Sequence, residues 1–125
     1  MKLLDTTVAI DHLRGAESAV DLLRQLVEED ETFLASEVTR FELLAGVRDD
    51  EFEALEEFFS ALSWVPVDEG VTRTAGLLAR KHRRAYSGID DVDYLVAATA
   101  LFLDAELLTT NVRHFPMIAG LRSPY

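Results

Sequence analysis

Short apolar runs alternate with longer amphipathic segments along all 125 residues of the chain. Apolar runs of about four to eight residues, bounded by turn residues, indicate buried strands, and apolar residues spaced three and four apart indicate helices. Strands that alternate with helices predict a parallel sheet covered on both faces. We therefore expect an α/β fold, a three-layer α/β/α sandwich with a central parallel β-sheet, formed by residues 1–125 as a single domain.

The apolar runs predict four strands, at residues 2–5, 32–35, 64–67 and 106–109. Pro66 cannot donate a ladder hydrogen bond, which places the third strand at an edge of the sheet. The tail after Phe115 is a candidate for a last edge strand near Leu121. Six helices are expected, at about residues 6–14, 18–29, 36–45, 50–62, 69–84 and 91–103, the first capped by Thr6 or Thr7 and ended by Gly15, and the third capped by Ser36.

The charge of the chain constrains its partners. Twelve Lys and Arg residues against 23 Asp and Glu give a formal net charge of −11. Such a chain repels a polyanion, so contact with nucleic acid requires metal ions or a local basic patch, and a basic protein partner is equally suggested. The absence of cysteine excludes disulfides, thiolate zinc sites and cysteine nucleophiles. Neither a membrane-spanning run nor a signal peptide is visible, which predicts a cytoplasmic protein without membrane contact.

Polar residues that directly follow strands are the first candidates for chemistry, because ligands bind beyond the carboxyl ends of parallel strands. Asp5 ends the first predicted strand, and Asn111 follows the fourth. Glu42 lies among apolar neighbours in a predicted helix, and Asp93 stands in the first turn of an alanine-rich one. No single helix can join residues so far apart in sequence, so only the fold can bring them together.

A cluster of carboxylates predicts a metal ion. Buried carboxylates repel one another and are costly to desolvate unless a positive charge lies between them. Oxygen ligands without cysteine or paired histidine favour Mg²⁺ or Mn²⁺ over zinc. Water bound to such an ion can attack a phosphodiester, and the ion stabilises the charge that develops on the phosphate.

Each candidate residue also has an ordinary structural interpretation, and spacing alone does not decide between the two. These interpretations are Asp5 as a helix cap, Glu42 as a surface residue, Asp93 as a first-turn acid, Asn111 as a turn former, and Asp90 and Asp91 as caps and solvated charges.

Four segments, in order along nearly the whole chain, resemble the motifs of PIN-domain proteins, most closely the VapC-type toxins of toxin–antitoxin pairs. They are Leu3-Leu4-Asp5-Thr6-Thr7, the run from Ser36 to Gly46 that contains Phe41-Glu42-Leu43-Leu44, Asp93 with Leu95-Val96-Ala97-Ala98-Thr99-Ala100, and the run from Leu107 to Phe115 that contains Thr109-Thr110-Asn111.

The resemblance implies a Mg²⁺- or Mn²⁺-dependent endoribonuclease. Carried over by position, Asp5, Glu42 and Asp93 are the catalytic acids and metal ligands, and Asn111 occupies the place of a fourth polar or acidic residue. His114 stands where relatives often have Asp, a departure that weakens any second metal site. The implied partners are RNA as substrate, a second copy in a homodimer, and a cognate antitoxin with a basic C-terminal segment.

Two other function classes remain open at this stage. A non-catalytic PIN-like binding module is supported by the missing fourth acid alone. A phosphotransferase with Asp5 as nucleophile is disfavoured, because haloacid-dehalogenase-like enzymes need an acid two residues later and this chain has Thr7.

Two further features have two interpretations each. The basic run Arg80-Lys81-His82-Arg83-Arg84 is a candidate RNA-backbone contact, although cations that complement the helix dipole are the favoured interpretation. The three histidines lack ligand spacing; the resemblance could bring His114 near the site, but a surface or loop position is favoured.

Overall fold

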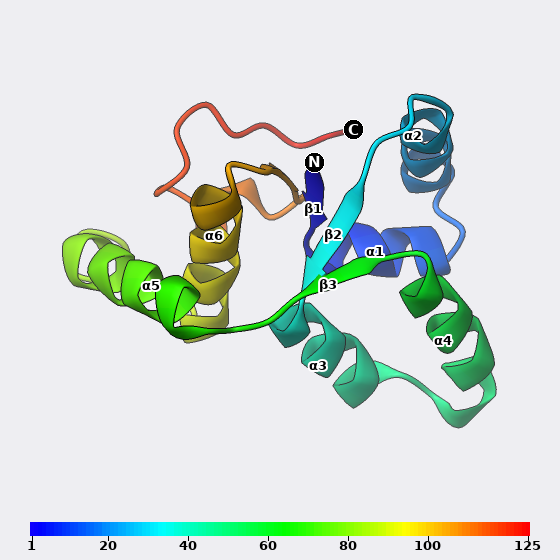
Figure 1. Ribbon diagram of the computed structural model, residues 1–125, viewed down its shortest axis with the longest axis horizontal. Helices are drawn as coiled ribbons and strands as arrows, with labels where there is room; N and C mark the ends of the chain where they lie inside the picture. The colour runs from blue at the N-terminus through cyan, green and yellow to red at the C-terminus, as the bar shows by residue number, and fades with distance from the viewer.

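The predicted α/β/α sandwich is confirmed by a computed structural model that describes residues 1–125. Its four strands form one sheet in which all neighbours are parallel, in the order β3-β2-β1-β4. Figure 1 shows β1, β2 and β3 side by side at the centre of the molecule. The strands are β1 (Lys2–Leu4), β2 (Phe33–Ser36), β3 (Ser63–Val65) and β4 (Glu106–Leu108).

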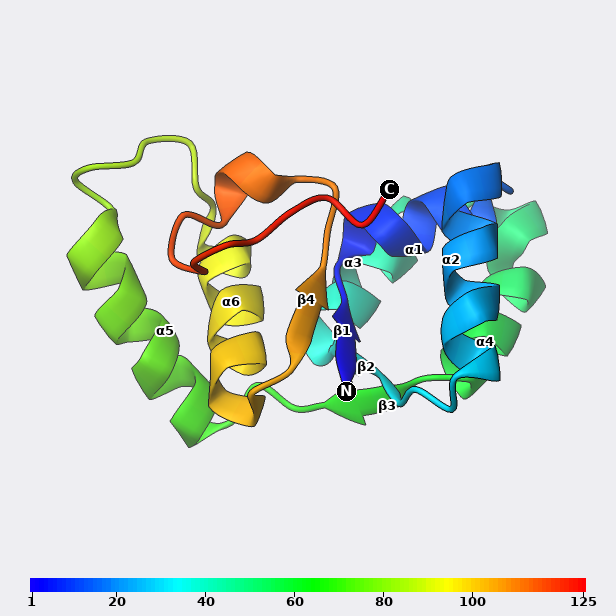
Figure 2. The ribbon, with the colours of Figure 1, turned by 90° about the horizontal axis from the view of Figure 1, so that it is seen from above.

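Helices cover both faces of this sheet. In Figure 2, α5 and α6 lie on one side, and α1, α2 and α4 lie on the other. Helix α3 contacts both α1 and α6, so it joins the two layers. The helices are α1 (Thr6–Leu13), α2 (Glu17–Glu28), α3 (Glu37–Gly46), α4 (Phe52–Ser60), α5 (Glu69–His82) and α6 (Asp91–Leu103), with short 3₁₀ turns η1 (Asp49–Glu51) and η2 (Val112–His114). None of them combines the length and apolar character that crossing a lipid bilayer requires.

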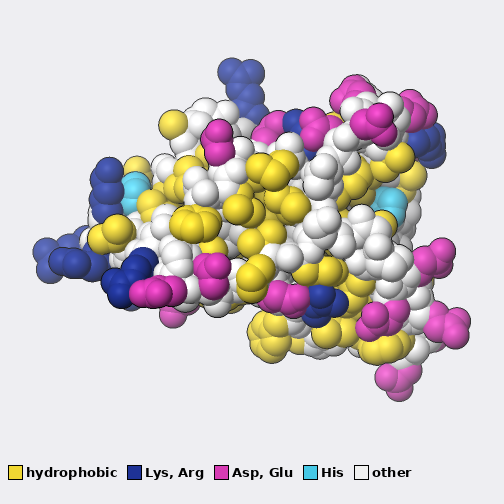
Figure 3. Space-filling view, viewed as in Figure 1, with side chains coloured by type: hydrophobic (Ala, Val, Ile, Leu, Met, Phe, Trp, Pro, Cys, Tyr) yellow, Lys and Arg dark blue, Asp and Glu magenta, His cyan; other side chains and the backbone are white.

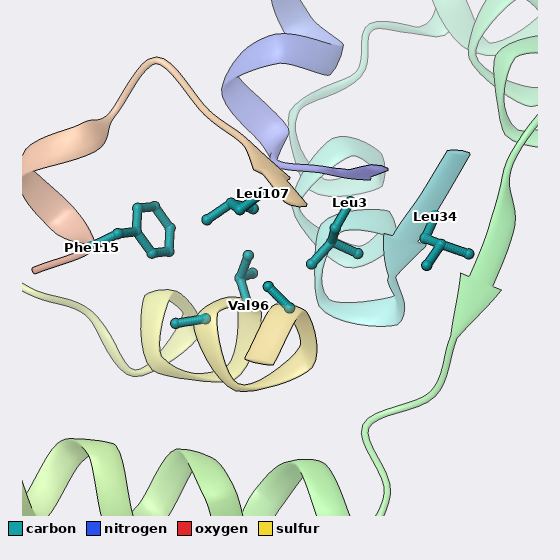
Figure 4. Packing of buried hydrophobic residues seen from close by; sticks show 7 residues of the cluster. Leu3, Leu34, Val96, Leu107 and Phe115 are labelled. Carbon is teal, nitrogen blue, oxygen red and sulfur yellow. The ribbon is translucent and has the colours of Figure 1, made fainter. Parts of the chain in front are cut away.

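The paired strands β1 and β4 send alternate side chains to opposite faces, as the period of two along a strand requires. Leu3 and Leu107 are register partners and pack on α6, with Val96 and Phe115 (Figure 4). Leu4 and Leu108, the next register pair, pack on α1 and α2. Because both faces of β1 and β4 are buried, these strands read as continuous apolar runs in the sequence.

Several predicted boundaries differ from those in the structure. Asp5, rather than Thr6 or Thr7, is the N-cap residue of α1, because its backbone is still extended while Thr6 is already helical. Ser36 caps α3 as predicted, accepting a hydrogen bond from the Val38 N–H at 3.1 Å. Strand β3 is an edge strand, as predicted, but it ends before Pro66, which has no N–H to donate. The predicted helix 50–62 is divided into η1 and α4.

The predicted last edge strand near Leu121 is wrong. The tail after η2 forms no strand and crosses the top of the molecule in Figure 2 towards α1. Leu121 packs on the α6 core instead, and the Tyr125 hydroxyl donates to Asp11 Oδ2 at 2.6 Å. A bend at Gly120, whose φ of +73° suits a residue without a Cβ, interrupts the extended backbone that a strand needs.

Candidate active site

The candidate residues gather at the point where the strand order reverses. Strand β1 has β2 on one side and β4 on the other, so the chain leaves the sheet in opposite directions there. In parallel sheets the crevice at the carboxyl ends of such strands is the usual ligand site. Asp5 follows β1 and Thr109 follows β4, and this edge lies at the top of Figure 2.

Asp5 is a buried carboxylate held by hydroxyl groups. Thr109 Oγ1 donates to Asp5 Oδ2 at 2.7 Å, and Thr7 Oγ1 lies 3.4 Å from the same oxygen. Although Asp5 is the N-cap residue of α1, its side chain makes no capping hydrogen bond. Only 6% of the residue is exposed. Burial, and to a smaller extent the charge of Asp93, raises the pKa of Asp5, while the hydroxyl hydrogen bonds oppose this rise.

Glu42 reaches the same region from α3. Thr6 Oγ1 donates to Glu42 Oε1 at 2.7 Å, which ties α1 to α3. Burial raises the pKa of Glu42, and the charges of Asp5 and Asp93 raise it further, while the Thr6 hydrogen bond lowers it. Glu42 is therefore a half-buried acid facing other acids, and the surface interpretation does not hold.

Asp93 combines a capping role with a place in the cluster. Its Oδ2 accepts the Asp90 N–H at 3.2 Å, so it closes the capping box at the start of α6. The same oxygen lies 3.1 Å from His114 Nδ1. The Asp93 side chain is 17% exposed. The interpretation as a first-turn acid is thus correct but incomplete, since the charge of Asp93 acts on both Asp5 and Glu42.

His114 and Asn111 lie at the rim of this cluster. His114 is in η2, a loop position as predicted, but its ring contacts Asp93, which the favoured surface interpretation did not anticipate. Asn111 is exposed, and its Nδ2 lies 3.3 Å from His114 Nδ1. Its backbone N–H donates to Thr109 Oγ1 at 3.0 Å. No hydrogen bond joins the Asn111 amide to any of the three acids, so the fold brings it near them without direct contact.

The three acids lack a cationic partner within the protein. No Lys or Arg forms an ion pair with Asp5, Glu42 or Asp93, and His114 is the one basic group in contact. In this structure their side chains do not form a group of three that could bind one metal ion together. Mg²⁺ does not require three protein ligands at once, because it is usually bound through one or two carboxylates and keeps several waters. Uncompensated acids with oxygen donors alone therefore fit a hard divalent cation.

Sequence reasoning missed the threonines that hold the acids. Thr109 is fully buried although it is polar, and it contacts Asp5, Thr7 and the Asn111 backbone. The position of Thr109 in the sequence could have indicated this role. A hydroxyl residue directly after a buried apolar strand lies at the carboxyl end of that strand, where ligands bind in parallel sheets.

The fold and the site together define a class, the parallel α/β proteins that carry a group of acids at the strand-order reversal. The profile of the PIN domain matches residues 2–121, and the chain belongs to the PIN-domain family. It is similar to Ribonuclease VapC19 of Mycobacterium tuberculosis, with 59% identity over 125 residues and 100% of both chains covered. It is also similar to Ribonuclease VapC10 of that species, with 38% identity over 100% of this chain and 93% of the relative.

Solved structures share the fold. FitAcB from Neisseria gonorrhoeae is 26% identical and superposes with a TM-score of 0.77, covering 92% of this chain and 91% of that one. VapBC2 from Rickettsia felis, solved bound to a DNA fragment from its promoter, gives a TM-score of 0.83 at 24% identity and covers 96% of this chain and 94% of its own. At that identity the second comparison shows the fold alone.

Proposed function

We propose that this chain is a divalent-metal-dependent endoribonuclease, the toxin of a VapBC-type toxin–antitoxin pair, that hydrolyses RNA phosphodiester bonds. Relatives as similar as 59% over the full length are named ribonucleases, which supports the activity. The observation that carries the proposal is the group of Asp5, Glu42 and Asp93, whose charges act on one another without a Lys or Arg partner. Residues 1–125 act as one domain in this proposal.

Asp5, Asp93 and Glu42 are the residues that would hold Mg²⁺ or Mn²⁺. When bound, such an ion lowers the pKa of water and stabilises charge on the phosphate. The hydroxyls of Thr109 and Thr6 donate to Asp5 and Glu42 and oppose the rise in pKa that burial causes. The Asp90 N–H orients Asp93. The part of the protein is therefore to hold these three acids near one another without a Lys or Arg partner, so that a divalent cation would balance their charge.

Asp5→Asn and Asp93→Asn test the activity. Each keeps the side-chain shape and one acceptor oxygen, so the fold, followed by circular dichroism, should remain while RNA cleavage falls by about a hundredfold or more. Asp104→Asn is the matched control, because Asp104 is an exposed acid at the other end of the same helix and its left-handed backbone suits asparagine. Cleavage that persists in excess EDTA, or in both site variants, would contradict the proposal. Partner binding with no cleavage at any Mg²⁺ or Mn²⁺ concentration would favour the binding-module alternative.

The cognate antitoxin in this proposal binds beside Glu42 through a basic C-terminal segment. A surface hollow of about 630 Å³ lies between α1, α3 and α4. Glu42 opens onto it, and its apolar lining includes Ile10, Leu13, Leu43 and Leu55. An amphipathic segment with one basic side chain matches this combination of apolar wall and acid.

Gly46→Leu tests this docking. A Cβ at Gly46, in the lining of the hollow, meets no atom within 4 Å, so a larger side chain fills the hollow without disturbing the fold. Titration with the protein encoded by the neighbouring gene should show weaker binding to this variant, whereas Gly76→Leu, an equally open position on α5, should bind normally. Equal binding by both variants would place the antitoxin elsewhere.

The proposal also includes a homodimer. Exposed apolar side chains on α3 and α6, which contact each other, support a covered surface there. They are Phe41, Leu44, Leu101 and Phe102. Sedimentation velocity of Phe41→Ser and Phe102→Ser against the unmodified chain tests it, and a monomeric unmodified chain would contradict it.

A further inference from the structure

The positive charge of this acidic protein is concentrated at one end of α5. Residues 70–89 contain no Asp or Glu, although the whole chain has 23 of them. Within that stretch the side chains of Arg80, Lys81, Arg83 and Arg84 are all exposed, and we call these four residues the basic patch. Figure 3 shows Lys and Arg side chains gathered at the left end of the molecule, over the carboxyl end of α5, while acids dominate the opposite end.

The patch is barely used inside the protein. Arg83 pairs with Asp91 at 2.6 Å, but both side chains are more than half exposed, and such pairs contribute little to stability. Arg80, Lys81 and Arg84 form no ion pair, and no side chain of the patch bonds to the last carbonyls of α5. Their position suits the helix dipole, yet the dipole does not require three unpaired cations. These charges are therefore available to an external anion.

Three arginines of the basic patch line an open hollow on the surface, where a nucleic-acid strand has access to them. Arg80, Arg83 and Arg84 line a surface hollow of about 690 Å³, whose floor is made of Gly76 and Ala79. Gly76, Ala79 and Arg80 lie three and four residues apart on one face of α5, and Arg83 and Arg84 follow in the turn that ends this helix. Gly76 and Ala79 have small side chains, and the three arginines that line the hollow with them carry guanidinium groups, which bind phosphate oxygens in pairs.

Aromatic rings border the patch on the side of the loop to α6. The rings of His82 and Tyr86 are 5.9 Å apart, and Tyr86 is 47% exposed. A cationic surface next to an accessible aromatic ring is the usual arrangement for single-stranded nucleic acid, since phosphates meet the cations and a base stacks on the ring.

The patch lies on the path to the candidate active site. Helix α5 ends at the same edge of the molecule at which α6 begins, and the loop between them arches along that edge in Figure 2. The Arg83–Asp91 pair ties the patch to the first turn of α6, two residues before Asp93. The patch is therefore joined to the helix turn that carries Asp93.

We propose that the basic patch binds the phosphates of the RNA strand beside the scissile bond and so holds a polyanion on a protein whose overall charge repels it. This inference rests on the proposed ribonuclease function. RNA is favoured over an acidic protein segment because the Arg83–Asp91 pair joins the patch to the turn that carries Asp93, and because the exposed ring of Tyr86 lies beside the patch.

The test is the salt dependence of RNA binding, measured in EDTA so that the strand is not cut. The probe is a fluorescein-labelled single-stranded RNA of about 15 nucleotides, followed by anisotropy. For single strands, the slope of log affinity against log salt changes by about 0.7 for each phosphate contact. Arg80→Gln/Lys81→Gln/Arg84→Gln should therefore make the slope shallower by about 2. The fall in RNA affinity between about 50 and 200 mM salt should then be roughly twentyfold smaller for this variant than for the unmodified protein.

Two comparison proteins sharpen the result. Arg24→Gln/Arg48→Gln/Arg122→Gln removes the same charge from exposed positions elsewhere and should leave the slope nearly unchanged. Tyr86→Ala should weaken binding by about tenfold with the slope retained, because stacking releases no counterions. In Mg²⁺, the patch variant should cleave RNA with a raised KM and an unchanged kcat, since the patch does not touch the reacting atoms.

The other outcomes contradict either the role of the basic patch or the nuclease proposal. An unchanged slope in the patch variant, or an equal change in the control triple variant, overturns the patch. If the patch variant loses binding to a polyglutamate peptide but still binds RNA normally, the proposed RNA contact is wrong and the patch binds an acidic protein partner. An unmodified protein that never cleaves RNA, but whose RNA binding needs the patch, refutes the nuclease proposal and leaves the patch as an RNA-binding surface.

Discussion

Removing the Thr109 hydroxyl should weaken both the fold and the site, because this single buried group holds Asp5. Thr109→Val keeps the shape of the side chain and deletes the 2.7 Å hydrogen bond to Asp5 Oδ2. A hydrogen bond to a charged group contributes about 1.5–3 kcal/mol, against about 1 kcal/mol for a neutral pair. The Asn111 N–H also loses its acceptor, but Asn111 is exposed and water can replace it. We therefore expect a loss of about 2 kcal/mol at neutral pH.

Urea unfolding in EDTA measures this loss, and Thr99→Val is the matched control. Thr99 is as buried as Thr109, but its hydroxyl donates to the neutral Leu95 carbonyl at 2.8 Å, so its removal should cost about 1 kcal/mol at every pH. The Thr109→Val loss should shrink towards that value in acid, because the hydroxyl lowers the pKa of Asp5 and matters most when Asp5 is ionised. Mg²⁺ binding to Thr109→Val should weaken by about 10–100-fold. Equal losses for both variants at every pH would refute the reasoning.

Two further substitutions test single polar side chains, one exposed beside the acids and one buried without a hydrogen-bond partner. Asn111→Ala should lower RNA cleavage by less than about tenfold, because its amide contacts His114 rather than a carboxylate; a loss as large as that of Asp5→Asn would place the amide among the catalytic groups. Thr39→Val should raise the free energy of unfolding by about 1 kcal/mol, because the buried Thr39 hydroxyl has no partner and its removal ends an uncompensated desolvation; a loss in urea unfolding would mean that the hydroxyl has a partner.

The sheet and the layers could be predicted because their signals are local. Leu3-Leu4 and Leu107-Leu108 are short apolar runs bounded by polar residues, and they form adjacent parallel strands. The tail could not be predicted in the same way. Leu121 is apolar whether it pairs in a sheet or packs on α6, and the choice depends on contacts with residues far away in sequence.

Part of the candidate site could be predicted and part could not. Asp5 and Asp93 follow from their positions at the ends of elements, whereas Glu42 was predicted from the family resemblance and not from its position. The packing of α3 on α1 is what brings Glu42 to Thr6. The contact of His114 with Asp93 depends on how η2 folds back over the start of α6, which no local pattern encodes. The capping interpretation of Asp93 and its place in the cluster are both correct, because one carboxylate oxygen serves both.

The central claim is that the fold holds Asp5, Glu42 and Asp93 together in a way that a divalent cation makes favourable. Burial raises the pKa of Asp5 and of Glu42, so the folded protein binds these protons more tightly than the unfolded chain. The contribution of these two acids to stability in EDTA should therefore be fully present near and below about pH 4, their unfolded range, and should be lost as pH rises through their folded pKa values.

The most direct measurement is the free energy of unfolding from pH 4 to 8, with and without Mg²⁺, for the unmodified protein, Asp5→Asn and the exposed-acid control Glu53→Gln. Mg²⁺ at about a hundred times its dissociation constant should add about 2.7 kcal/mol at neutral pH and almost nothing at about pH 4. Asp5→Asn should lose this gain and Glu53→Gln should keep it. Stabilisation by Mg²⁺ that is absent at neutral pH, or equally large in acid and in Asp5→Asn, would contradict the account.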